Sequence, residues 1–91
     1  MGRTIVHHNH KKRDLFKPER LLNSLVTCAL ANRWPEGKAS DTMTHVVRDV
    51  EKWLEKRALV TSKDIRRVAA KSLERFDKDL AESYAMGDKI I

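Results

Sequence analysis

The sequence has 91 residues, a net charge of +6 at pH 7 and a single cysteine. This length predicts one domain over residues 1–91 and excludes an enzyme with separate substrate and cofactor domains, while one cysteine excludes an internal disulfide. A single thiol fits a reducing compartment, and the N-terminus shows neither the apolar run of a signal peptide nor a membrane span, so we expect a cytoplasmic protein.

Positive charge is concentrated near the start of the chain. Residues 1–20 contain six basic and two acidic residues, which leaves +4 of the net +6. His7, His8 and His10 lie in the same stretch, and a bound anion would favour their protonated form. We therefore expect this segment to meet an anionic partner such as a nucleotide, a nucleic acid or an acidic protein.

Two short segments with β-branched or aromatic residues, 4–6 and 14–16, flank this polar run. They predict a β-hairpin over residues 4–16 with a turn near residues 9–11. An isolated hairpin is barely stable in water, so it has to pack against the rest of the domain. Ile5 and Phe16 are the expected anchors.

Pro18 suits the first position of a helix, and apolar residues then recur at three- and four-residue spacing. The face predicted for this helix consists of Leu21, Leu22, Leu25, Cys28, Ala29 and Leu30. Proline and glycine interrupt the pattern over residues 34–37. Ser40 or Asp41 is expected to cap a second helix, whose apolar face consists of Met43, Val46, Val47, Val50, Trp53 and Leu54.

Residues 58–60 predict a third short strand, and Thr61 with Asp64 has the spacing of a capping box before a third helix. Residues 77–79 supply a cap for a last helix that ends near Gly87. The faces predicted for these two helices consist of Ile65, Val68, Ala69, Leu73 and Phe76, and of Ala81, Tyr84 and Ala85. The predicted fold is mainly α, a four-helix bundle capped by an N-terminal β-hairpin or a small three-stranded sheet.

Neither a metal site nor a catalytic site is predicted. In a strand, His8 and His10 share a face while His7 points to the other, and no cysteine or carboxylate completes a tetrahedral set. Cys28 lies on an apolar helix face, where a neutral thiol is favoured. The remaining carboxylates are scattered among lysines and arginines, as on a solvated face, so we do not expect an enzyme.

Two features suit an anionic ligand. The first is the run from Lys11 to Arg13 with Lys17 and Arg20, because these cations precede a helix N-terminus whose amides and dipole also favour a phosphate. The second is the segment 60–62, where hydroxyls and helix-start amides could bind a sugar or phosphate. Capping of the helix alone explains this second feature equally well.

The order and spacing of these parts resemble the ATP-cone, a regulatory domain at the N-terminus of many ribonucleotide reductases and in the repressor of their genes. The residues at the spacing of its opening motif are Val6, Asp14, Phe16 and Arg20. The segment 60–66 is similar to the start of the family's third helix, and Leu80, Ala81 and Tyr84 are similar to its closing motif. The resemblance spans residues 4 to about 86.

The resemblance implies a site for ATP or dATP, with Mg²⁺, between the hairpin and the helices. The implied residues are Val6, Asp14 and Lys17 at the adenosine end, Arg20 at the phosphates, and Ser62 and Arg66 on the third helix. In the hairpin, His8 and Asn9 replace the family's nucleotide-contacting Lys-Arg pair. Each charge-assisted hydrogen bond lost is worth about 1.5–3 kcal/mol. Lys11, Lys12 or Arg13 would have to supply this binding energy instead.

Three functions follow from these observations. The first is a regulatory nucleotide-binding domain that acts on a ribonucleotide reductase-type enzyme or assembles with itself. The second is a degenerate cone that acts as a protein-interaction module. The third is a nucleic-acid-binding module that uses the basic hairpin, and its affinity would fall steeply with salt.

Overall fold

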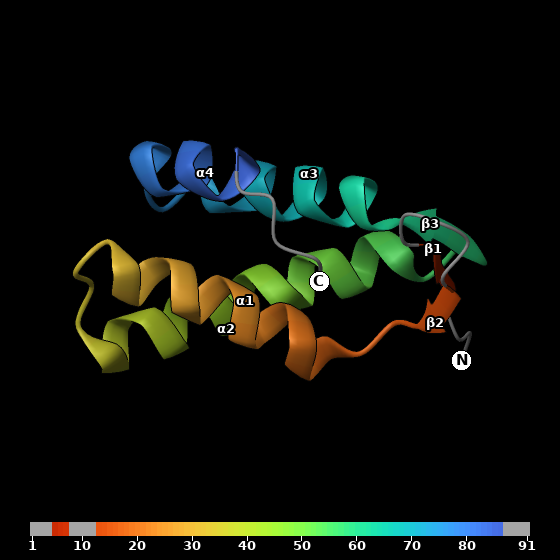
Figure 1. The fold of residues 1–91 in the computed structure, drawn as a ribbon, viewed down its shortest axis with the longest axis horizontal. Coiled ribbons are helices and arrows are strands. Elements are labelled where there is room, and N and C mark those ends of the chain that lie inside the picture. Colours follow the sequence, from red (N-terminus) through yellow and green to blue (C-terminus); the bar gives the residue numbers. More distant parts are fainter. Residues whose placement is uncertain (1–4, 8–12, 87–91) are drawn as a thin grey trace.

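A computed structural model describes residues 5–7 and 13–86, and this part of the chain is mainly helical. It contains the strands β1 (Ile5–His7), β2 (Arg13–Leu15) and β3 (Leu59–Thr61) and the helices α1 (Pro18–Ala31), α2 (Glu36–Leu54), α3 (Ser62–Leu73) and α4 (Lys78–Ala85). The sheet lies at one end of the helices (Figure 1). None of the described helices is long and apolar enough to span a membrane.

The four helices enclose one hydrophobic core. Neighbouring helices pack in chain order, and α4 also contacts α1. The largest fully buried side chains come from all four helices: Leu21, Leu25, Met43, Val46, Val50, Ile65, Leu73 and Leu80. They recur at three- and four-residue spacing, so the predicted apolar faces of the first two helices are confirmed, except that Leu30 is exposed and Leu22, Cys28 and Trp53 are half-buried.

The sheet has the strand order β2-β1-β3. β1 is antiparallel to β2 and parallel to β3, with Val6 opposite Asp14 on one side and Val60 on the other. Val6 and Val60 are buried, whereas Ile5 is 39% exposed, so the prediction that Ile5 anchors the hairpin is wrong. Successive side chains of a strand point to opposite faces, and it is Val6 that faces the helices.

The predicted strand limits are displaced by one residue. β1 extends to His7 and β2 begins at Arg13, so Phe16 follows the sheet instead of belonging to it. Phe16 is nevertheless partly buried against the core, as expected. The predicted turn at residues 9–11, Thr4 and Gly87 lie outside the described residues.

α1 begins at Pro18, as predicted, and ends in a Schellman motif. The amide of Trp34 donates to the carbonyl of Ala29 and the amide of Arg33 to that of Leu30, each at 3.0 Å. This closure requires a left-handed backbone, and Arg33 has a φ of 66°. An arginine therefore stands at the position where glycine is usual.

α2 begins at Glu36, one turn earlier than predicted, so Ser40 and Asp41 lie inside the helix and do not cap it. Pro35 is the N-cap residue, and its carbonyl accepts from the amide of Ala39 at 2.9 Å. A proline beside the first turn costs little because no amide is needed there. Ala39 is fully buried, and its packing favours the additional turn.

α3 and α4 begin where their caps predict. Asp77 accepts a hydrogen bond from the amide of Leu80 at 2.9 Å, which caps α4. α3 ends at Leu73, so Phe76 is not part of its buried face: it is 45% exposed and stacks on His45. Ala85 is also exposed, because it occupies the last position of α4.

Candidate functional site

The sheet brings the end of the hairpin's first strand to the start of α3. Parallel pairing places His7 opposite Thr61, the N-cap residue of α3. The second strand continues through Phe16 to Lys17, the N-cap residue of α1. Both helices therefore begin at the end of the molecule that carries the sheet (Figure 1), although more than 40 residues separate Lys17 from Thr61 in the sequence.

The structure describes part of the site that the sequence predicts. The side chains of Val6, Lys17, Arg20, Ser62 and Arg66 are described, and of Asp14 the backbone is described. His8, Asn9, Lys11 and Lys12 lie outside the described residues. Val6 is only 4% exposed, so its side chain serves mainly in the core.

The start of α3 carries the predicted capping box. The Thr61 hydroxyl accepts from the amide of Asp64 at 3.0 Å, and the Asp64 carboxylate accepts from the amide of Thr61 at 3.2 Å. Arg67 also donates to that carboxylate, at 3.1 Å. The hydroxyl of half-buried Ser62 makes no hydrogen bond to any described residue, so it is the hydroxyl that a ligand at this helix start could use.

The start of α1, unlike that of α3, has no side-chain cap. Lys17 is exposed, and its side chain does not cap the helix. Pro18 follows at the first helical position and has no amide to satisfy. A lysine at the positive end of a helix dipole is unfavourable, whereas an anion there is favourable. Exposed Arg20 follows one turn later and adds a second cation to this helix start, whose first turn also carries the carboxylate of Glu19, as that of α3 carries Asp64.

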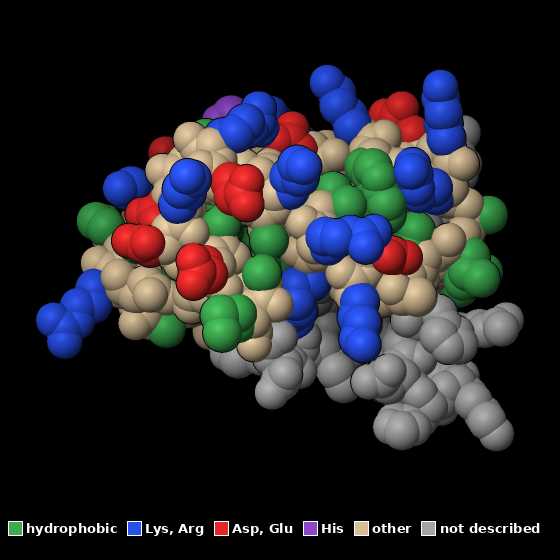
Figure 2. Space-filling model, turned by 90° about the horizontal axis from the view of Figure 1, so that it is seen from above, with side chains coloured by type: hydrophobic (Ala, Val, Ile, Leu, Met, Phe, Trp, Pro, Cys, Tyr) green, Lys and Arg blue, Asp and Glu red, His purple; other side chains and the backbone are tan. Residues whose placement is uncertain are grey.

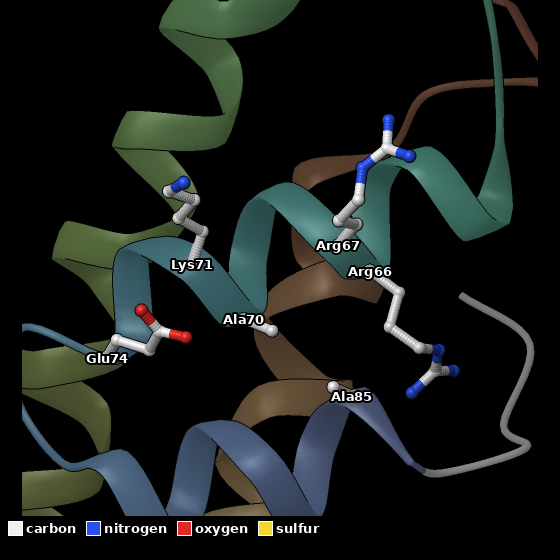
Figure 3. Close-up of a pocket in the computed structure, with 6 residues that line it drawn as sticks. All are labelled: Arg66, Arg67, Ala70, Lys71, Glu74 and Ala85. Atoms are coloured by element: carbon white, nitrogen blue, oxygen red, sulfur yellow. The ribbon is translucent and has the colours of Figure 1, made fainter.

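Arg66 lies one turn after Ser62 on α3 and is directed toward α4. Its guanidinium donates to the carbonyl of Tyr84 at 2.9 Å and lies 4.8 Å from the centre of the Tyr84 ring. Figure 3 shows the side chain extending past Ala85 at the end of α4. A ligand that engages Arg66 from the start of α3 would therefore compete with Tyr84.

Tyr84 links three helices. Its hydroxyl and that of Ser24 on α1 share a hydrogen bond of 3.1 Å. Burial raises the pKa of Tyr84, while the Ser24 hydrogen bond and the Arg66 charge lower this pKa in part. The sequence indicates Tyr84 as a core residue, but nothing in it links Tyr84 to Ser24, because the pair meets only when α4 packs on α1.

A cavity of about 350 Å³ lies between α3 and α4 (Figure 3). Its lining residues are Arg66, Arg67, Ala70, Lys71, Glu74 and Ala85. Two alanines leave the space open. Of the three cations, Arg66 extends toward α4, whereas Arg67 pairs with Asp64 and Lys71 extends on the side away from α4 (Figure 3). The volume is at the lower end of the range for ligand pockets, and Arg66 is the residue it shares with the site predicted from the sequence.

No group of three or more His, Cys, Asp or Glu side chains that could hold a metal ion is found in the described part of the chain. His8 and His10 lie outside that part. Cys28 is half-buried and packs against the core, as expected for a structural thiol.

No protein family model matches the sequence, and no curated protein or solved structure matches the chain either.

Proposed function

We propose that this chain is a nucleotide-binding regulatory domain of the ATP-cone type, which binds ATP or dATP with Mg²⁺ and has no catalytic centre of its own. The observation that carries the proposal is the parallel pairing of β1 with β3. It places the end of the hairpin beside the start of α3, while the hairpin's other strand leads into the start of α1. The N-termini of α1 and α3 thus both lie at the end of the molecule that carries the sheet (Figure 1).

This arrangement suits a triphosphate for electrostatic reasons. The positive ends of two helix dipoles and the cations Lys17 and Arg20 favour negative charge. In this proposal Arg20 contacts the phosphates, and Ser62 donates its hydroxyl from α3. Arg66 closes the site after exchanging the Tyr84 carbonyl for the ligand.

The element order also supports the proposal. A hairpin, two helices, a third strand and two more helices follow one another, and the sheet covers one end of the helices. The resemblance to the ATP-cone implies a four-helix bundle with such a cap. The regulated partner in this proposal is a ribonucleotide reductase-type enzyme or a second copy of the chain.

Thermal unfolding with and without nucleotide tests this function. A ligand that binds only the folded state raises the melting temperature, so millimolar ATP or dATP with Mg²⁺ should raise it. Arg20→Gln should weaken binding by at least about tenfold in calorimetric titration, because a charge-assisted contact is lost. Arg48→Gln, at an exposed position of α2, is the matched control and should bind as the wild type does.

The double variant His8→Lys with Asn9→Arg should strengthen binding, because it restores the two charges of the family motif. An unchanged melting temperature at millimolar nucleotide would contradict the proposal. So would tighter binding of a short DNA duplex that falls steeply with salt. Trp34 is half-buried with Lys38 over its ring, an arrangement that offers little for stacking of bases.

A further inference from the structure

A groove of about 760 Å³ lies between α2 and α3 and reaches the first residue of α4. It is separate from the proposed nucleotide site. The residues that line it are Asp49, Lys52, Trp53, Val68, Lys71, Ser72, Glu74, Arg75 and Lys78. On the face shown in Figure 2, hydrophobic side chains lie among Lys and Arg side chains.

The floor of the groove is apolar. Trp53 from α2 and Val68 from α3 are each half-buried and pack against the core from outside. Arg57 lies 4.2 Å from the centre of the Trp53 ring and donates to the Trp53 carbonyl, so it holds the indole in place. A fixed aromatic ring beside an aliphatic side chain is a suitable contact for one bulky apolar group of a partner.

The rim of the groove is positively charged. Asp49 is already engaged, because it accepts hydrogen bonds from Ser72, at 2.6 Å, and from Arg75. Lys52, Lys71 and Lys78 make no ion pair with any described residue, and Glu74 is the only other carboxylate of the lining. Figure 3 shows the Lys71 side chain extending from α3 on the side away from α4. The amines of Lys52, Lys71 and Lys78 around the apolar floor therefore favour a negatively charged partner.

The dimensions indicate a short helical partner. The lining positions on α3 run from Val68 to Ser72, about 6 Å or just over one helical turn, and Glu74 and Arg75 continue the lining past the end of the helix. We propose that this groove binds an acidic amphipathic helix of a partner protein, with an apolar side chain on Trp53 and Val68 and carboxylates toward the three lysines. Charge complementarity argues against a second copy of this chain, whose net charge is also positive.

Fluorescence anisotropy with a synthetic peptide tests this surface. The probe is a rhodamine-labelled peptide of about 14 residues, with leucine at helical spacing on one face and glutamate elsewhere. Lys71→Glu and Lys52→Glu should each weaken its binding by about fivefold, and more together. Val68→Ala should also weaken it, without loss of fold, because alanine favours the helix.

Lys38→Glu is the matched control, since Lys38 lies over Trp34 in the first turn of α2, away from the groove, and the charge change is the same. It should bind the probe as the wild type does. Circular dichroism establishes that each variant is folded. Equal binding by the groove variants and the wild type would overturn the proposal, and so would a preference for a single-stranded oligonucleotide or for the same peptide with lysine in place of glutamate.

Discussion

Replacing Arg33 by glycine should stabilise the protein. Arg33 closes the Schellman motif of α1 with a φ of 66°, a conformation that costs an L-residue about 1–2 kcal/mol. Its side chain is exposed and makes no hydrogen bond or ion pair with a described residue, so its removal costs nothing in contacts. Glycine also gives the unfolded chain more conformational entropy, which offsets the gain by about 0.4–1 kcal/mol. The expected net gain is about 0.5–1 kcal/mol.

This gain is measurable in a small domain. It corresponds to a rise in melting temperature of about 2–8 °C. Urea unfolding, followed by far-ultraviolet circular dichroism and by tryptophan fluorescence, should show a higher midpoint with an unchanged slope. The two probes should give the same midpoint if unfolding is two-state.

Two further variants isolate the backbone effect. Arg33→Ala removes the same charge but keeps a Cβ atom, so it should leave stability within about 0.5 kcal/mol of the wild type. Ala31→Gly places glycine in the last turn of α1, where the backbone is helical, and should cost about 1 kcal/mol. If Arg33→Gly were no more stable than Arg33→Ala, the left-handed backbone would not be the source of the cost and the reasoning would be refuted.

Two other predictions concern Tyr84 and Thr61. Tyr84 is the only tyrosine of the chain, so an alkaline absorbance titration follows it alone, and its midpoint in the folded protein should lie above the ordinary pKa of 10.0 because burial disfavours the phenolate. The folded state then holds this proton more tightly than the unfolded state, so the associated stability is present below pH 10.0 and is lost as the pH rises through the folded pKa. Tyr84→Phe should not show this alkaline loss of stability. An identical pH dependence of stability in both proteins would contradict the raised pKa of Tyr84. Thr61→Ala should cost about 1 kcal/mol in urea unfolding because it removes the cap of α3, and Thr61→Ser should keep most of the stability, whereas equal losses would show that the hydroxyl is not the cause.

The helices could be predicted from the sequence because their signals are local. Val46 and Val50 lie one turn apart on the buried face of α2, and spacing alone identifies that face. Thr61 and Asp64 are three residues apart and form the capping box that this spacing predicts. A cap or an apolar face depends on neighbours in the chain, so it needs no knowledge of the fold.

The start of α2 could not be predicted, because local signals compete there. Ser40 and Asp41 are better capping residues than Pro35, and Gly37 disfavours a helix. The structure nevertheless begins the helix at Glu36, and Ala39 is then fully buried. Tertiary packing outweighs the capping preference, and no residue near Ser40 indicates this outcome.

The sheet and the site depend on pairs that are distant in the sequence. Ile5 and Val6 are both β-branched, and only the pairing of Val6 with Val60 determines which of them is buried. The contact of Arg66 with Tyr84 likewise exists only because α4 packs beside α3. The sequence could therefore propose Arg66 as a ligand contact but could not show that α4 already engages it.

The position of β1 between β2 and β3 has a consequence for how the molecule folds. The central strand comes from residues 5–7, but one of its two neighbours comes from residues 59–61, after α1 and α2. During synthesis the hairpin keeps an open edge until residue 61 has left the ribosome, and a hairpin of two strands is marginal in water. A chain shortened before Leu59 should therefore leave residues 5–15 without a stable sheet, and closure of this long loop should make folding slower than for a purely helical domain of the same size.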